Sequence, residues 1–345
     1  MTKAMKQQKV KNRTTYKWIY RLAAVLLILF FVTVMFFILQ IQENASDPAS
    51  EKIIRDAAAK QISKDPNELT DEDYVKITKL GFDSIMPTLL TDIKFLEKFS
   101  NLKELSLSSV RVPKTKKEIP KWRTLLLKLG IEYKPNEELL LDLSPLKRLK
   151  NLEILNLNKA RIKNLKPLAN LINLKKLYLS QTVSQSKTQI RNLKPLKKLT
   201  NLEILNLEGN RINDLKPLRE MKNLEVLNLY SSQIEDFQSL RQLRVLNNLH
   251  VLYLDNTKID NLEPIANLTS LQRLVLNDNP IKNLEPVKGL INLKELCILN
   301  TQVSDLEPVK SLKNLQYFSI IGCRNISDQQ VEDLQKALPN LKITR

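Results

Sequence analysis

The chain has 345 residues, 43% of them hydrophobic, and a formal net charge of +18. Only five glycines and two cysteines are present, which argues against a disulfide scaffold or a linker-rich chain. A single histidine leaves little for metal binding or imidazole-based catalysis, so the composition disfavours an enzyme and we expect no cofactor and no metal.

Residues 1–21 form a basic tail with seven lysines and arginines and no acid, and residues 22–41 follow as an apolar segment. From Leu22 to Leu39 only Thr33 is polar, and at 1.5 Å per residue this run spans roughly 27 Å, close to the thickness of a bilayer core. A cleaved signal peptide would show the same order of charge and hydropathy, usually with a shorter apolar run. We expect a single transmembrane signal anchor, with a cytoplasmic N-terminus and everything downstream exported to the periplasm or outside the cell.

Residues 42–76 are expected to be a linker followed by a helical cap. Asp47-Pro48 is typical of a helix start, and Thr70 to Asp73 resembles a capping box. An uncovered first repeat would expose leucines to water, so these helices should cover the end of the array that follows. One face of the first helix is apolar, with Ile53, Ile54, Ala57, Ala58 and Ile62.

A 22-residue repeat organises the chain from residue 77 to residue 321. The segment Asn201-Leu-Glu-Ile-Leu-Asn-Leu207 restates Asn151-Leu-Glu-Ile-Leu-Asn-Leu157, and Ile, Leu and Pro-Leu positions follow in both. Self-similarity of this period predicts a solenoid whose stacked units share one core. Insertions precede Leu102, Leu152, Leu202 and Leu249, and the longest spans about residues 113–140. The first leucine-type positions are Ile77, Leu102, Leu152, Leu174, Leu202, Leu224, Leu249, Leu271, Leu293 and Leu315.

These motifs resemble the 22-residue leucine-rich repeats of bacterial internalin-like proteins and of a eukaryotic phosphatase regulator grouped with them. The cap from Ile54 to Asp73 is also similar to caps of bacterial members. The resemblance implies an α/β-type repeat solenoid, curved, with a parallel β-sheet on its concave side and short turns or 3₁₀ segments on its convex side. It also implies that a partner binds the concave sheet, although fold alone rarely fixes function.

Two further sets of repeat positions are interpreted as structural. Small or polar residues should satisfy backbone groups in a tight turn, at Ala160, Thr182, Asn210, Ser232, Thr257, Asn279, Thr301 and Cys323. Prolines are expected to break any regular element on the convex side, at Pro167, Pro217, Pro264, Pro286 and Pro308.

Residues 322–345 are predicted to be a C-terminal cap with one amphipathic helix carrying Val331, Leu334, Leu338 and Leu341. Cys297 should face Ser319, which places Cys323 too far away for a disulfide, so two free thiols are expected.

The concave surface follows from strand parity, because the third, fifth and seventh residues of each repeat should point out of the core. Tyrosines recur there among Ile and Val, on what we expect to be consecutive rungs. Large rings on a rigid surface are typical of protein-binding sites, whereas β-propensity alone would also favour Tyr, Val and Ile. The predicted contacts are Tyr178, Ile204, Asn206, Val226, Asn228, Tyr230, Val251, Tyr253, Asp255 and Arg273.

The 113–140 insertion is a second candidate, because Trp122 and Arg123 lie in a basic segment with helical spacing of its apolar residues. It could contact a partner or a membrane, or fold back on the solenoid and bury its apolar stripe. The residues before the convex prolines change from basic to acidic along the chain, either as a dipolar edge that orients a partner or as a solvated face. They are Lys166, Lys194, Lys216, Gln238, Glu263, Glu285 and Glu307.

Two hypotheses remain open. The first is a membrane-tethered module that recognises a protein or peptide without catalysis. The second is an envelope scaffold that associates with itself or with wall polymer. No Gly-rich phosphate loop or catalytic triad is found, and the dispersed basic residues argue against nucleic acid as a partner.

Overall fold

The computed structural model describes residues 48–82, 92–108, 140–162, 164–180 and 189–345. The chain divides into two compact units, Met1–Pro48 and Ala49–Arg345, and the second contains the whole solenoid. The basic tail, the expected anchor at residues 22–41 and most of the 113–140 insertion, including Trp122 and Arg123, lie outside the described residues. Within the described ranges, no helix combines the length and the hydropathy that crossing a bilayer requires.

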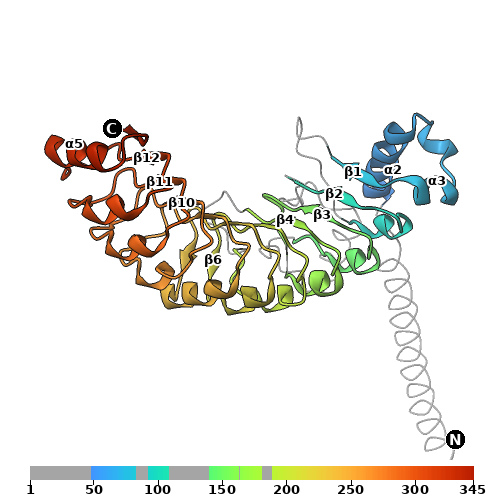
Figure 1. Ribbon diagram of the computed structural model, residues 1–345. Helices are drawn as coiled ribbons and strands as arrows, with labels where there is room; N and C mark the ends of the chain where they lie inside the picture. The colour runs from blue at the N-terminus through green and yellow to red at the C-terminus, as the bar shows by residue number, and fades with distance from the viewer. Residues whose placement is uncertain (1–47, 83–91, 109–139, 163, 181–188) are drawn as a thin grey trace, which may run out of the picture. The chain divides into compact units, whose positions relative to one another are not determined.

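Eleven parallel strands form one sheet along the inner side of the solenoid (Figure 1). The strands pair without offset in repeat register, so that Leu205 of one strand faces Leu227 of the next. The predicted solenoid with a parallel sheet is therefore confirmed. A second, two-stranded sheet pairs β6 (Arg211–Ile212) with β8 (Gln233–Ile234), which follow the turns after β5 and β7. The main strands are β1 (Lys79–Gly81), β2 (Glu104–Ser106), β3 (Ile154–Asn156), β4 (Lys176–Tyr178), β5 (Ile204–Asn206), β7 (Val226–Asn228), β9 (Val251–Tyr253), β10 (Arg273–Val275), β11 (Glu295–Cys297), β12 (Tyr317–Ser319) and β13 (Lys342–Thr344).

Short 3₁₀ helices cover the outer side of the same repeats (Figure 1). The repeat prolines begin these helices instead of breaking a regular element, because Pro fits the first turn, where an N–H would have no partner in any case. An Asn or Asp before each helix accepts a backbone N–H, as when Asp214 Oδ1 accepts from Lys216 at 2.7 Å. The helices are η2 (Lys94–Lys98), η4 (Ser144–Arg148), η5 (Lys166–Asn170), η6 (Lys194–Leu196), η7 (Lys216–Glu220), η8 (Phe237–Val245), η9 (Glu263–Ile265), η10 (Glu285–Gly289) and η11 (Glu307–Ser311).

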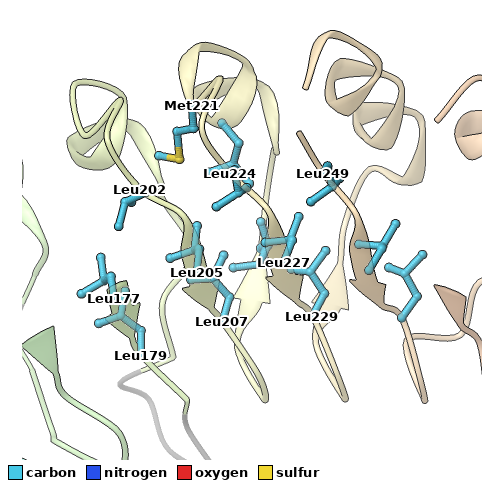
Figure 2. Packing of buried hydrophobic residues seen from close by; sticks show 14 of the residues in the cluster. Leu177, Leu179, Leu202, Leu205, Leu207, Met221, Leu224, Leu227, Leu229 and Leu249 are labelled. Atoms are coloured by element: carbon cyan, nitrogen blue, oxygen red, sulfur yellow. The ribbon is translucent and has the colours of Figure 1, made fainter. Parts of the chain in front are cut away.

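The core lies between these two layers. In the ten rungs that start from Ile77 to Leu315, the first, fourth and sixth residues are buried, as for Leu202, Leu205 and Leu207, and the residues of the outer side add further apolar side chains, such as Met221 (Figure 2). Each rung buries its leucines against both neighbours, so the stack as a whole supplies the hydrophobic stabilisation that one repeat lacks.

Two helices pack onto the core before the first rung. Helix α2 (Pro48–Ile62) buries Ile54 and Ala58, and η1 (Pro66–Glu68) joins it to α3 (Asp71–Lys76), which starts at the expected Thr70–Asp73 capping box. Tyr74 of α3 packs edge-on against Phe95 and Phe99, with ring centroids 5.3 and 5.1 Å away. The repeat that starts at Ile77 forms a rung of the sheet, because its strand β1 buries Leu80 and pairs with β2.

The last segment departs from the predicted single helix. Helix α5 (Asp328–Ala337) begins at the Ser327–Gln330 capping box and ends before Leu338. Leu341 is buried beside β13, which pairs with β12 and adds an eleventh rung to the sheet. The apolar spacing alone could not show this, since a short apolar segment after a helix fits either element.

Side-chain amides link neighbouring rungs at two places. The buried Asn279 donates to the carbonyls of Leu254, Leu276 and Asn277, and Asn210 makes the equivalent bonds in its own rung. An exposed Asn just before the first leucine donates to the preceding rung, as when Asn292 Nδ2 donates to the Thr269 carbonyl at 2.8 Å. In the seven rungs from Leu152 to Leu315 where it is described, the eighth residue has a positive φ, at Lys159, Gly209, Ser231, Asn256, Asp278, Asn300 and Gly322.

Candidate functional site

The candidate surface is the outward side of the main sheet. On β3, β4, β5, β7 and β9 the middle residue is buried and its two neighbours are partly exposed, which confirms the parity used to predict the contacts. Because the strands have no offset, residues at the same repeat position form straight rows across the sheet.

An apolar row crosses three adjacent strands at the third repeat position. Ile204 on β5 pairs with Val226 on β7, which pairs with Val251 on β9, and all three side chains are partly exposed. The next residue in this row is Arg273 on β10, and Glu295 on β11 follows it. The aliphatic row is therefore bordered by charged residues at both ends, by Lys176 on β4 beside Ile204 and by Arg273 on β10 beside Val251.

The tyrosines are not on consecutive rungs as expected. Tyr178 and Tyr253 share the fifth-position row, but Asn206 and Asn228 stand between them. At a strand spacing of about 4.8 Å, the two rings are roughly 14 Å apart along the row. Only Tyr230 and Tyr253 lie on adjacent rungs, and Tyr230 is the more open of the two, with 43% of its surface exposed.

Two of the predicted asparagine contacts already have a local role. Asn206 Oδ1 accepts the backbone N–H of Glu208 at 2.9 Å, and Asn228 Oδ1 accepts that of Tyr230 at 2.8 Å. Such bonds fix the chain where it leaves the strand. Asn228 therefore positions the backbone of Tyr230, the most exposed ring of the candidate surface.

Asp255 differs most from its expected place, since only 6% of it is exposed. Its Oδ1 accepts from Asn277 Nδ2 at 2.7 Å, and its Oδ2 is buried without a hydrogen-bond partner among the described residues. Burial is the main cause that raises the pKa of this carboxyl above its ordinary value. Asp255 is thus buried and hydrogen-bonded to Asn277 of the next rung instead of facing outward.

A polar cluster borders the apolar row. Arg273 pairs with Glu295 at 3.1 Å, and its guanidinium carbon lies 5.5 Å from the centroid of the Tyr253 ring. The Cys297 thiol lies 3.8 Å from Glu295 Oε1, and burial followed by the Glu295 charge raises the pKa of that thiol to about 11. The thiol is therefore neutral at physiological pH and a poor nucleophile.

Sequence reasoning left Glu295 out of the predicted contacts. The signal was present, because Glu295 follows Arg273 by one 22-residue repeat and carries the opposite charge. Residues one repeat apart face each other across adjacent strands, so this ion pair could have been read from the spacing.

Both cysteines are free, as predicted, and both are buried; Cys297 pairs with Ser319 in the sheet register. Cys323 takes the turn position that Ala, Ser, Asn or Thr occupies elsewhere, and its thiol donates to the Ile298 carbonyl at 2.9 Å. In the parts of the chain that the structure describes, no three His, Cys, Asp or Glu side chains gather where they could hold a metal ion.

The charged convex edge lies at the start of the 3₁₀ helices, and all seven of its residues are exposed. At its acidic end Glu285 pairs with Lys288 at 2.6 Å and Glu307 with Lys310 at 2.5 Å. These local pairs offset much of the negative charge, which favours the solvated-face interpretation of this edge.

Comparison with known proteins supports the repeat assignment. The family described as Leucine Rich repeats (2 copies) matches residues 200–242 and 247–289. No curated protein sequence gives a significant match.

Three solved structures of bacterial proteins are similar. An internalin (inlF) from Listeria monocytogenes aligns with a TM-score of 0.59 and 22% identity, over 87% of this chain and 91% of that one. Internalin C2 (inlC2) from the same species gives 0.50 and 25%, over 79% and 93%. A leucine-rich repeat protein from Leptospira interrogans gives 0.54 and 26%, over 80% and 75%. The chain thus carries leucine-rich repeats in a solenoid similar in structure to those of bacterial internalin-like proteins.

Proposed function

We propose that the chain is a protein-recognition module whose concave sheet binds a protein or peptide partner without catalysis. The observation that carries the proposal is the apolar row of Ile204, Val226 and Val251, which lies beside Tyr230 and Tyr253. Aliphatic and Tyr side chains on a rigid sheet bury area on binding at little entropic cost. Leucine-rich repeat solenoids commonly use this face for protein binding.

The two ends of the apolar row differ, since Lys176 borders one end and the Arg273–Glu295 ion pair borders the other. A partner that covers the apolar row with nonpolar side chains meets Arg273 and Glu295 at one end of it. Charged groups at the border of an apolar patch add specificity and register more than affinity. We infer that the partner presents an apolar centre with polar groups on the β10–β11 side.

The proposed attachment is a single membrane-spanning segment at residues 22–41, with the N-terminus in the cytoplasm and the repeats exported. Its support is the apolar run and the basic tail that precedes it. Protease added to spheroplasts should digest the repeat region and leave a short N-terminal fragment in the membrane. Full protection of the repeats would reject the proposed orientation.

The binding proposal is tested by crosslinking in membranes followed by capture of the full chain. We expect one heterologous partner in fixed ratio, and its yield should fall at least tenfold for Tyr230→Ala with Tyr253→Ala. The matched control is Ile172→Ala with Ile291→Ala, which removes two exposed apolar side chains that precede the strands. Capture mainly of the chain itself would favour the envelope-scaffold alternative, and equal losses in both double variants would reject the concave site.

A further inference from the structure

A groove of about 610 Å³ opens on the rim of the solenoid, away from the concave sheet. We call it the rim groove. It lies where η8, η9 and η10 end and β9, β10 and β11 begin. The residues that matter for its chemistry are Arg244, Asn247, His250, Asn267, Gln272 and Lys294.

The groove coincides with a break in the exposed asparagine ladder. Asn precedes the first leucine of each rung from Leu102 to Leu315 except at Leu271, where Ser270 stands instead. Asn248 and Asn292 each donate to the rung before, whereas the shorter Ser270 donates to the Leu249 and Leu246 carbonyls at 2.9 and 3.3 Å. A smaller side chain with a different bonding pattern leaves space at this rung.

The basic residues of this row lose their acidic neighbours at the same place. In earlier rungs the second repeat position carries Lys103, Glu153, Lys175, Glu203 and Glu225, and Glu153 pairs with both lysines. His250, Gln272 and Lys294 follow, with no acidic residue among them. No carboxylate lines the groove, and Arg244 and Lys294 form no ion pair with any residue that the structure describes. The groove therefore offers basic groups and amides to a ligand that brings its own negative charge.

The spacing of the basic groups decides what kind of anion fits. His250, Gln272 and Lys294 are linked by backbone hydrogen bonds. The Gln272 N–H donates to the His250 carbonyl and the Lys294 N–H to the Gln272 carbonyl, both at 2.8 Å. His250 and Lys294 are two rungs apart, which is roughly 10 Å at the usual strand spacing. A single phosphate or carboxylate cannot contact both. Side chains on one face of an extended peptide start about 6.6–6.8 Å apart, and two long acidic side chains can diverge from there to reach both basic groups.

The amides between the basic groups favour a peptide over an inorganic polyanion. Gln272, Asn247 and Asn267 each carry a donor and an acceptor, and a peptide backbone presents both of their complements. A polyphosphate presents acceptors only. We propose that the rim groove binds an extended acidic peptide segment, with its carboxylates at Lys294, His250 and Arg244 and its backbone on the amides.

This site rests on the proposed function only in that the segment would belong to the partner protein. The test uses a fluorescein-labelled hexaglutamate peptide and the full chain in detergent micelles, with fluorescence anisotropy at low salt. For Arg244→Gln with Lys294→Gln we expect about tenfold weaker binding, because two exposed charge contacts are lost. Both side chains are exposed, so the variant should fold and melt like the parent chain.

The matched control is Lys197→Gln with Lys216→Gln, which removes two exposed charges from η7 and the end of η6. It should weaken peptide binding less than twofold. An equal loss in both double variants would show attraction by net charge and overturn the proposal, as would no measurable binding by the parent chain. Complete displacement by inorganic phosphate at constant ionic strength would also overturn it. None of these outcomes alters the concave-face test, which uses different residues and the captured partner.

Discussion

The buried Asn279 gives the sharpest test of how the rungs are joined. Its Nδ2 donates to the carbonyls of Leu254, Leu276 and Asn277 at 2.8, 2.9 and 3.1 Å, and its Oδ1 accepts the Thr257 N–H at 3.1 Å. Asn279→Ala removes these four bonds and the longer one from Thr257 Oγ1 at 3.4 Å, and it leaves buried backbone groups unpaired. At about 1 kcal/mol per bond, we expect a loss of about 3–4 kcal/mol of unfolding free energy.

Asn279→Thr should be the intermediate variant. Thr257 and Thr301 occupy the same repeat position, and each donates its hydroxyl to a carbonyl of its own rung, at 2.7 and 2.8 Å. A threonine at residue 279 can keep that one bond, so we expect a loss of about 2–3 kcal/mol. Urea unfolding followed by circular dichroism measures both variants.

The control is Asn292→Ala, which removes one exposed hydrogen bond to the Thr269 carbonyl. It should cost no more than about 1 kcal/mol, since water can replace an exposed partner. If Asn279→Ala and Asn292→Ala cost the same, the buried amide is not what joins these rungs.

Three other positions give further tests. Burial raises the pKa of Asp255 above its unfolded value, so the folded chain loses stability as pH rises through that range. Asp255→Asn should therefore be at least as stable as the parent at pH 7 and should show a flatter pH profile in thermal melts; a clear loss at pH 7 would contradict this. Because burial raises the pKa of Cys297 to about 11, a thiol reagent at pH 8 should label the native chain at least tenfold more slowly than the urea-unfolded chain, and equal rates would refute the burial. Gly322→Ala should cost about 1–3 kcal/mol in urea unfolding, because φ is +75° and a Cβ would collide with Asn300 Oδ1, whereas Gly209→Asn at the same repeat position should cost less than 1 kcal/mol.

The repeat spacing was enough to predict most of the fold. The positions from Ile77 to Leu315 each lead into a strand of the main sheet, and the Thr70–Asp73 capping box begins α3 as expected. Leucine periodicity is a strong signal because each rung must bury the same three positions. The eleventh strand was missed, since Leu341 follows a helix and lacks a complete repeat around it.

The sequence was enough to predict which strand residues of the candidate site leave the core, but not how each side chain is buried or hydrogen-bonded. Which side chains leave the core follows from alternation along a strand, and this was correct for Ile204, Val226 and Val251. The burial of Asp255 and its hydrogen bond with Asn277 one rung away are side-chain details that alternation does not describe. The rim groove depends on the substitution of one ladder Asn by Ser270, a difference of a few atoms in a pattern that looks polar throughout.

The unshifted pairing of the strands limits how a peptide can lie on the concave sheet. Equivalent side chains recur at about 4.8 Å across the strands, whereas side chains on one face of an extended peptide recur at about 6.6–6.8 Å. The two spacings coincide only after about seven rungs, which correspond to about five same-face side chains of the peptide. Most side chains of an extended partner laid along a row therefore do not align with the side chains of the sheet. A folded partner has no fixed side-chain period, and its surface can match the row of Ile204, Val226 and Val251 at every rung.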